Sequence, residues 1–275
     1  MNRIDTTFDR LRREGRKGLV TFLTAGDPAP DQTVPLLHTL VASGVDVLEL
    51  GVPFTDPLAD GPVIQRASER ALAHDISLED VLEMVRAFRA EDPDTPVVLM
   101  GYANPVERMG PARFAERAAE AGVDGLLTVD MPPEEAAEWA RPLPEAGVAP
   151  IMLVAPTTAE ERLEKTVELA RGFIYYVSMT GVTGGGGLDV ASVEEHVAPI
   201  RARTDLPVAV GFGVRDADSA AAVAGAADAV VVGSALIRTV EAHIRHSDDG
   251  ALREALAAQV ADLRRGVDRH GAAPD

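Results

Sequence analysis

Eight short apolar runs recur along the chain, and this series limits the folds that the chain can adopt. The runs cover residues 18–26, 46–51, 96–102, 124–130, 149–155, 172–178, 207–213 and 228–234. They are apolar throughout rather than alternating, which is typical of strands buried on both faces of a parallel sheet. Between them lie segments with apolar residues at helical spacing, such as Val34, Leu37, Leu40 and Val41. The pattern predicts strands that alternate with helices.

A weak internal repeat supports the same unit. "SGVDVLEL" begins at residue 43, "AGVDGLLTV" at 121, "AGVAPIMLV" at 146 and "GAADAVVVG" at 225. We interpret each copy as a helix end, a turn and a strand, with the glycine in the left-handed conformation that ends the helix. Capping boxes at Ser77-x-x-Asp80 and Thr158-x-x-Glu161 are expected to begin two of the helices. Eight such units predict a (β/α)8 TIM barrel.

The 275 residues contain no linker or low-complexity tract, so we expect a single barrel domain over residues 1–268. An extra helix near 5–14 is expected before the first strand, residues 251–268 read as the last helix, and 269–275 are expected to be a flexible tail. The rival fold is an open doubly wound sheet with a nucleotide site. Its fingerprints are missing, because "GFGVRD" breaks the glycine pattern at Asp216 and neither lysine follows a glycine.

The charge and the composition exclude several classes of partner. A formal charge of −18 opposes binding to phosphate backbones, so no nucleic-acid partner is expected. No run of about 18 apolar residues is present and the N-terminus lacks a secretory signal, so we expect no membrane association and a cytoplasmic location. The absence of cysteine excludes disulfides and thiolate metal sites. An anionic small molecule is then expected to be held mainly by backbone N–H groups and helix dipoles.

The segment "LELGVPFTDPLADGP", residues 48–62, gathers negative charge at the end of the second predicted strand. Local ion pairing does not explain this charge, because no Lys or Arg occurs between Lys17 and Arg66. If the flanking leucines face the helices, Glu49 points into the mouth of the barrel. Burial there would raise the pKa of Glu49 and let it exchange a proton near neutrality. The alternative is a carboxylate that only accepts backbone hydrogen bonds.

Other polar residues near strand ends carry weaker signals. Asp60 is compatible with a function and with a turn before Gly61, and Asp56 is expected to be an ordinary loop residue. Tyr175 lies in the sixth run, where a core tyrosine is the default, and Asp130 is expected to cap the helix that follows it. The histidines fall in helical or tail segments, so no metal site is expected; they are His38, His74, His196, His243, His246 and His270.

Glycine clusters follow the last three predicted strands: "GVTGGGG" after the sixth, "GFG" at the end of the seventh and "VGSAL" at the end of the eighth. Loops at these places in barrels often bind phosphate, because glycine lets the backbone approach an anion closely. The three clusters together predict a phosphate site. The four-glycine run is also compatible with a plain mobile loop, and in an enzyme it would be a lid over the substrate.

Several segments resemble the α chain of tryptophan synthase, in matching order and over nearly the whole chain. They are "LELGVPFTDPLADGPVIQ", "GYANPV", "PIMLVAPTT", "SMTGVTG", "GFGV" and "VVGSAL". The resemblance implies retro-aldol cleavage of indole-3-glycerol phosphate to indole and glyceraldehyde 3-phosphate, with no cofactor in this chain. It also implies a partner β chain that carries pyridoxal phosphate, in an α2β2 heterotetramer.

The resemblance assigns roles by position. Glu49 would be the general acid and base, Asp60 would take or bind the indole N1 proton, and Tyr175 would lie near the catalytic carboxylate. The indole pocket would be lined by Phe22, Met100, Leu127 and Phe212. The phosphate would be held by the backbone N–H groups of Gly184, Gly213, Gly233 and Ser234. Thr183 would lie on the loop that closes against Asp60.

Pro53 and Asp56 would lie on the loop that contacts the β chain. The run "GGGLDV" after Gly184 is more glycine-rich than the family pattern, and this difference puts the ordering of the lid in question.

One alternative function is that of another phosphate-binding barrel, such as a ribulose-phosphate epimerase or an indole-glycerol phosphate synthase. These use histidine-bound metal or a strand lysine, which the predicted strands lack. The other is a non-catalytic subunit that activates a β chain, and such a subunit would not need Glu49 and Asp60.

Overall fold

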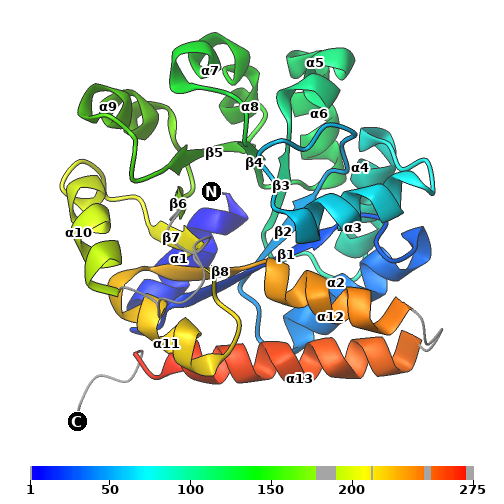
Figure 1. The fold of residues 1–275 in the computed structure, drawn as a ribbon. Coiled ribbons are helices and arrows are strands. Elements are labelled where there is room, and N and C mark those ends of the chain that lie inside the picture. Colours follow the sequence, from blue (N-terminus) through cyan, green and yellow to red (C-terminus); the bar gives the residue numbers. More distant parts are fainter. Residues whose placement is uncertain (1, 178–189, 212, 245–248, 271–275) are drawn as a thin grey trace.

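The computed structural model describes residues 2–177, 190–211, 213–244 and 249–270. Eight parallel strands in these ranges form one closed barrel, in which each strand pairs with its neighbours in sequence and the last pairs with the first (Figure 1). The strands are β1 (Gly18–Thr24), β2 (Val47–Gly51), β3 (Val97–Gly101), β4 (Gly125–Thr128), β5 (Ala149–Val154), β6 (Ile174–Val177), β7 (Val208–Gly211) and β8 (Ala229–Val232). The predicted TIM barrel and its eight predicted strands are therefore confirmed.

Helices surround the strands on the outside of the barrel (Figure 1). They are α1 (Arg3–Arg13), α2 (Thr33–Ala42), α3 (Pro62–Leu72), α4 (Leu78–Arg89), α5 (Ala103–Met109), α6 (Pro111–Ala121), α7 (Pro133–Trp139), α8 (Pro142–Glu145), α9 (Glu160–Leu169), α10 (Val190–Arg201), α11 (Ala217–Ala226), α12 (Ser234–His243) and α13 (Asp249–Asp268), with a 3-10 turn η1 (Pro30–Gln32) before α2. The expected extra helix is α1, and the expected last helix is α13. Within the described ranges, none of the helices has the length and apolar character needed to cross a membrane.

The C-terminal helix and the start of the predicted tail pack against the barrel. α13 runs along α2, α11 and α12 (Figure 1). Arg269, the first residue of the predicted tail, donates a hydrogen bond from Nη1 to Asp218 Oδ1 at 2.6 Å. Residues 271–275 of that predicted tail lie outside the described residues.

The interior of the barrel is filled with side chains. Alternate residues of the strands point inward and form one apolar cluster, because side chains alternate along a strand. Its members include Val20, Val47, Val98, Leu127, Ile151 and Phe173. Ile4, Phe8 and Leu11 of α1 join this cluster and close the N-terminal end of the barrel. Open space for a ligand is therefore left at the C-terminal end.

The opposite faces of the strands pack against the helices in a second core. Leu48 and Leu50 of β2 belong to this outer core, together with Leu36 and Leu40 of α2. Both β2 leucines are fully buried. Because they face the helices, Glu49 between them faces the inside of the barrel, as the sequence predicted.

The internal repeat has a structural cause at the N-terminal end of the barrel. Asp46, Asp124 and Asp228 occupy the same position in three copies of the repeat, just before β2, β4 and β8. Each carboxylate accepts a hydrogen bond from a backbone N–H near the start of the neighbouring strand. The donors are Leu19 at 3.0 Å, Val97 at 2.9 Å and Val208 at 2.9 Å. The aspartates thus fix the register of the neighbouring strands.

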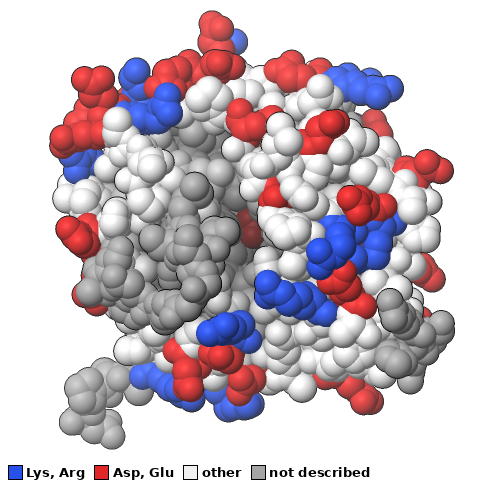
Figure 2. Space-filling view, in the orientation of Figure 1, with Lys and Arg blue, Asp and Glu red and all other residues white. Residues whose placement is uncertain are grey.

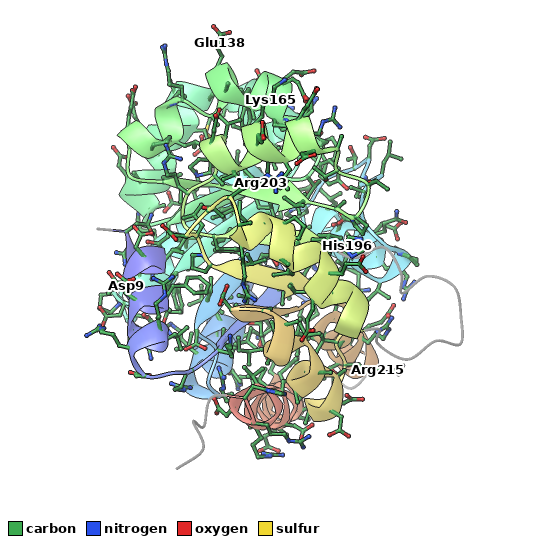
Figure 3. All side chains as sticks on the ribbon, turned by 90° about the vertical axis from the view of Figure 1, so that its left-hand side faces the viewer. Asp9, Glu138, Lys165, His196, Arg203 and Arg215 are labelled. Carbon is green, nitrogen blue, oxygen red and sulfur yellow. The ribbon has the colours of Figure 1, made fainter. Side chains whose placement is uncertain are left out.

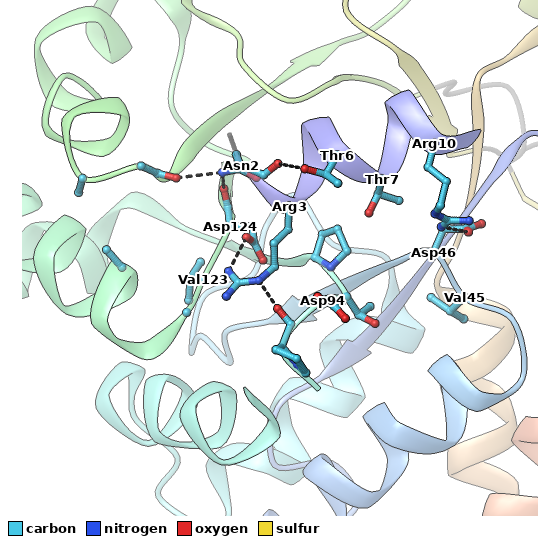
Figure 4. Close-up of a pocket in the computed structure, with 17 residues that line it drawn as sticks. Asn2, Arg3, Thr6, Thr7, Arg10, Val45, Asp46, Asp94, Val123 and Asp124 are labelled. Carbon is cyan, nitrogen blue, oxygen red and sulfur yellow. Dashed lines mark hydrogen bonds and ion pairs between the residues drawn. The ribbon is translucent and has the colours of Figure 1, made fainter. Parts of the chain in front are cut away.

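Arginines neutralise the two buried aspartates of this set, Asp124 and Asp46. Asp124 Oδ2 lies 2.6 Å from Arg89 Nη2 and its Oδ1 lies 3.0 Å from Arg3 Nη1. Figure 4 shows Arg3 reaching Asp124 from α1, in a hollow at the N-terminal end of the barrel. Asp46 Oδ2 lies 2.8 Å from Arg264 Nη1. These pairs connect α1, α4 and α13 to the strands.

The helix-ending role predicted for the repeated glycines is correct in three copies and wrong in one. Gly44, Gly122 and Gly147 have positive φ angles of 106°, 87° and 83°. Gly225 lies inside α11 instead, and that helix ends at Ala227 in an extended conformation with φ −122°. A helix that ends in an extended residue needs no left-handed glycine.

Of the two predicted capping boxes, one is confirmed and one is wrong. Ser77 and Asp80 form the predicted capping box at the start of α4. The box predicted at Thr158 is wrong, because the N-cap of α9 is Ala159. The Thr158 hydroxyl oxygen instead accepts a hydrogen bond from the Ala155 N–H at 3.0 Å, in the turn before the helix.

Candidate active site

A cavity of about 380 Å³ opens at the C-terminal end of the barrel, where the strands meet the loops that follow them. Figure 2 shows the surface hollowed at the mouth of the barrel. Seven of the predicted site residues line this cavity: Phe22, Glu49, Met100, Tyr175, Gly213, Gly233 and Ser234. The structure therefore brings together residues from β1, β2, β3 and β6 and from the loops after β7 and β8.

Glu49 is the carboxyl group inside this cavity. It is 2 % exposed, and its neighbours in the strand register are Phe22 and Val98. Its Oε1 has no hydrogen-bond partner among the described residues, which argues against the alternative role as an acceptor of backbone hydrogen bonds. Burial raises the pKa of Glu49 from 4.5 to about 8, and the negative charge of Asp60 adds to this rise. Glu49 is therefore protonated at neutral pH and can act as a proton donor.

Aromatic rings and glycines shape the wall around Glu49. The ring of Phe22 lies so close to Gly51 that a Cβ atom there would be 2.5 Å from the ring carbon Cζ. Tyr175 lies equally close to Gly211, because a Cβ atom on Gly211 would be 2.6 Å from Oη of Tyr175. Burial and the charge of Glu49 raise the pKa of Tyr175 well above its usual value, so its phenol stays neutral. This part of the cavity suits a flat aromatic ligand.

Asp60 lies on the loop between β2 and α3, half-buried and outside the cavity lining, yet close enough to act on the pKa of Glu49. Tyr102, which follows β3, donates a hydrogen bond from Oη to Asp60 Oδ2 at 3.1 Å. The same hydroxyl accepts a hydrogen bond from the Ala59 N–H at 3.0 Å. Burial raises the pKa of Asp60, and the hydrogen bond from Tyr102 opposes that rise.

The side of the cavity formed by the residues that follow β7 and β8 suits an anion. α12 begins at Ser234 directly after Gly233, and the first N–H groups of a helix are unpaired donors at the positive end of its dipole. Arg238, one turn along α12, and Arg215, after β7, also line the cavity. Arg238 is exposed and makes no ion pair with another described residue. Figure 3 shows Arg215 at the end of the barrel away from Asp9 of α1.

The remaining predicted site residues divide into two groups. Leu127 is buried in the interior cluster, against which Met100 and Tyr175 also pack, and does not line the cavity. Thr183, Gly184 and Phe212 lie outside the described residues, as does the glycine-rich run 181–187. On the predicted contact loop, Pro53 is buried and Asp56 is exposed.

The role expected for Asp130 is wrong. Asp130 does not cap the helix that follows it, because α7 begins after Pro132. Its Oδ1 accepts a hydrogen bond from the Ala103 N–H at 2.8 Å, at the start of α5 in the preceding unit. The carboxylate therefore joins two neighbouring loops at the mouth of the barrel.

Three polar residues of the site were missed by sequence reasoning: Tyr102, Arg215 and Arg238. Tyr102 is the last residue of the predicted strand 96–102, so the rule that points to strand ends could have found it. Arg215 lies two residues after "GFG", and Arg238 lies four residues after Ser234. In both places the glycine cluster predicted binding by backbone N–H groups and gave no signal for a side chain. We expected an anion to be held mainly by backbone groups. The structure adds two cationic side chains, Arg215 and Arg238, to the lining of that site.

The hollow at the N-terminal end of the barrel differs from this cavity in the state of its buried acids. The hollow of about 800 Å³ shown in Figure 4 lies at the N-terminal end, where its Asp46 and Asp124 are paired with arginines. Among the residues that the structure describes, no group of three or more His, Asp and Glu side chains could hold a metal ion.

Comparison with known proteins identifies the family. The family described as tryptophan synthase alpha chain matches residues 8–266. The chain is 57 % identical to the tryptophan synthase alpha chain of Alkalilimnicola ehrlichii, over 98 % of this chain and 97 % of the relative. It is 56 % identical to that of Thioalkalivibrio sulfidiphilus, over 98 % of this chain and 100 % of the relative.

Solved structures agree with this. The crystal structure of tryptophan synthase subunit alpha from Legionella pneumophila superposes with a TM-score of 0.91 at 46 % identity, covering 98 % of this chain and 99 % of that one. A tryptophan synthase structure from M. tuberculosis superposes with a TM-score of 0.86 at 37 % identity, covering 97 % and 99 %. The chain therefore belongs to the tryptophan synthase alpha chain family.

Proposed function

We propose that this chain is a carbon–carbon lyase that carries out the α reaction of tryptophan biosynthesis, the retro-aldol cleavage of indole-3-glycerol phosphate to indole and glyceraldehyde 3-phosphate. One observation carries the proposal: a protonated and unpaired carboxyl group, Glu49, lies in an apolar slot that continues into a site suited to phosphate. Membership of the family supports the same reaction.

Glu49 supplies and recovers one proton in this scheme. It donates its proton to C3 of the indole ring while Asp60 takes the proton of N1, which yields the neutral indolenine tautomer. The carboxylate of Glu49 then takes the proton of the glycerol hydroxyl, the carbon–carbon bond breaks and its electron pair returns to the ring. Asp60 gives its proton back to N1. Both acids end in their starting states, so the cycle uses no cofactor in this chain.

The remaining groups hold the substrate in place. The ring fits between Phe22 and Tyr175, with Met100 beside it. Leu127 supports this pocket from the interior cluster against which Met100 and Tyr175 pack. The family resemblance adds Phe212, which lies outside the described residues, as a further contact. The phosphate lies against the N–H groups of Gly213, Gly233 and Ser234. The family resemblance adds Gly184, which lies outside the described residues, as a fourth donor. Arg238 and Arg215 add positive charge at the rim, which favours a dianion on an otherwise acidic protein.

A partner β chain that holds pyridoxal phosphate completes the proposal, in an α2β2 heterotetramer. The loop that carries Pro53 and Asp56 supports this, because Leu58 on the same loop is 92 % exposed. Beside the loop lies a hollow of about 580 Å³, lined by Phe54, Asn104 and Arg108 among others. An exposed leucine next to a hollow is favourable in a protein interface.

The direct test is to mix the purified chain with indole-3-glycerol phosphate and measure indole, with and without a β chain. We expect indole in both mixtures. Glu49→Gln should retain substrate binding and lower kcat by at least about 100-fold, because a positioned acid contributes that much. Asp60→Asn should be severe but less complete.

The same assay separates the alternatives. No indole under either condition, with a rise in β-chain activity on mixing, would favour a non-catalytic activating subunit. Indole formation that survives Glu49→Gln nearly intact would show that another group transfers the proton. The other phosphate-binding barrels would be indicated by turnover of a different sugar phosphate.

A further inference from the structure

Tyr102 joins two loops at the mouth of the barrel. It follows β3 as the residue before α5, and it is 7 % exposed. Its hydroxyl donates to Asp60 Oδ2 at 3.1 Å and accepts from the Ala59 N–H at 3.0 Å. A tyrosine hydroxyl has one proton, and here that proton is directed to the carboxylate because the neighbouring N–H occupies a lone pair.

The ring of Tyr102 is fixed by stacking. It packs on Phe54 with 4.9 Å between ring centroids and an angle of 26° between the rings. Phe54 belongs to the same loop as Asp60, so Tyr102 contacts that loop at two places, through its ring and through its hydroxyl. A stacked aromatic pair of this kind holds a side chain in one rotamer at small entropic cost.

Other contacts hold the backbone of the loop but leave the carboxylate to Tyr102. The Val52 N–H donates to the Met100 carbonyl at 2.8 Å, which attaches the start of the loop to β3. Gln65 Nε2 donates to the Asp60 carbonyl at 2.8 Å, which attaches its end to α3. In the part of the chain that the structure describes, Tyr102 is the hydrogen-bond donor to the Asp60 side chain.

We propose that Tyr102 is the positioning residue of Asp60, whose Oδ2 it holds so that Oδ1 is presented to the ring N–H of the substrate. The inference rests on the proposed function, because it assigns to Asp60 the indole nitrogen. Tyr102 itself transfers no proton in this scheme. It acts through the orientation and the charge of the carboxylate that it holds.

The charge argument follows from what surrounds Asp60. Burial disfavours a negative charge on Asp60, and the hydrogen bond from Tyr102 favours it. Without the hydroxyl, the pKa of Asp60 rises further, and a smaller fraction of the enzyme has the anion that accepts the N1 proton. The orientation of the carboxylate is also lost.

The test compares Tyr102→Phe, Asp60→Asn and the double variant as isolated chains, with kcat, KM and their pH dependence measured on indole-3-glycerol phosphate. Phe keeps the stack on Phe54 and removes only the hydroxyl. We expect kcat to fall by about 10- to 100-fold, as for loss of a hydrogen bond to a charged group, with KM nearly unchanged. The acid limb of the pH profile should move to higher pH. In the Asp60→Asn background, the same substitution should change kcat by less than about twofold, because its target is gone.

A wild-type kcat and acid limb in Tyr102→Phe would overturn the inference, and so would a loss of the same size in both backgrounds. A second measurement does not depend on the reaction: the pKa of Asp60, read from the carboxyl 13C signal that Asp60→Asn removes. It should rise in Tyr102→Phe, and an unchanged value overturns the inference. If the wild type forms no indole while this pKa shifts, the proposed function fails and the contact between Tyr102 and Asp60 stands.

Discussion

Phe22 and Glu49 occupy paired positions on the adjacent strands β1 and β2, so their side chains point to the same side of the sheet, into the barrel. The carboxyl group of Glu49 therefore lies beside the ring of Phe22, and it is buried away from solvent. Burial without a positive partner favours the protonated form of a carboxyl group. This relationship makes the stability of the protein, as well as its reaction, depend on the protonation of Glu49.

Glu49→Gln should change the pH dependence of stability. The pKa of Glu49 is about 8 in the folded state and 4.5 is its ordinary value, so between these pH values the folded chain binds one more proton at this site. Wild-type stability therefore falls as pH rises through this window, and the variant lacks that fall. The variant should gain on the order of 5 kcal/mol relative to wild type across the window. Urea unfolding at both ends measures it, and parallel pH dependences would contradict the burial of an ionisable Glu49.

Asp124→Asn should destabilise the barrel without changing kcat at low temperature. The substitution leaves Arg89 buried without its negative partner, which is expected to cost about 3 kcal/mol. Asp228→Asn is the matched control at the equivalent position of another repeat, where the carboxylate is 36 % exposed and the cost should be about 1 kcal/mol or less. Chemical denaturation ranks the two, and equal losses would show that ion pairing does not govern these sites.

Gly51→Ala should disturb the aromatic slot. The new methyl group would be 2.5 Å from the ring of Phe22, which must then move, at a cost of roughly 1 to 3 kcal/mol in stability and with a higher KM. Gly225→Ala is the control, because it lies inside α11 with its nearest neighbouring atom at 3.4 Å and should stabilise the helix by up to about 1 kcal/mol. Thermal unfolding and substrate kinetics on both variants check this; an unaltered KM in Gly51→Ala would argue against Phe22 as a pocket wall.

Arg238→Ala should weaken phosphate binding. Arg238 lines the anion side of the cavity and is exposed, so its loss is expected to raise KM about three- to tenfold at low salt with little change in kcat. The difference should shrink at high ionic strength, because an exposed charge is screened. Steady-state kinetics at two salt concentrations measure it, and a KM equal to wild type at low salt would remove Arg238 from the site.

The barrel could be predicted from the sequence because its determinants are local. Each strand is a continuous apolar run, and Gly44, Gly122 and Gly147 end helices through a conformation that other residues rarely adopt. Gly225 shows the limit. It lies three residues before its aspartate, whereas Gly44 and Gly122 lie two residues before theirs, and it falls inside a helix that the chain leaves in an extended conformation. Thr158 shows a second limit, because a nearby N–H occupied the hydroxyl oxygen that a cap requires.

The candidate site was predictable where one residue contrasts with its neighbours. Glu49 is an acid between two buried leucines, so its direction follows from strand alternation. Tyr102 was missed because its partner, Asp60, lies 42 positions away, and only the closed barrel brings the two loops together. Arg215 and Arg238 were missed because an arginine in a loop or a helix is ordinarily a solvated surface residue.

The pKa of Glu49 tests the account most directly. It can be followed by 13C NMR of the glutamate side-chain carboxyl carbons, with the Glu49 signal assigned by its absence in Glu49→Gln. The account predicts a titration midpoint near 8 in the isolated chain. A midpoint near the ordinary value of 4.5 would show that Glu49 is ionised at neutral pH and would contradict its role as the proton donor to the substrate.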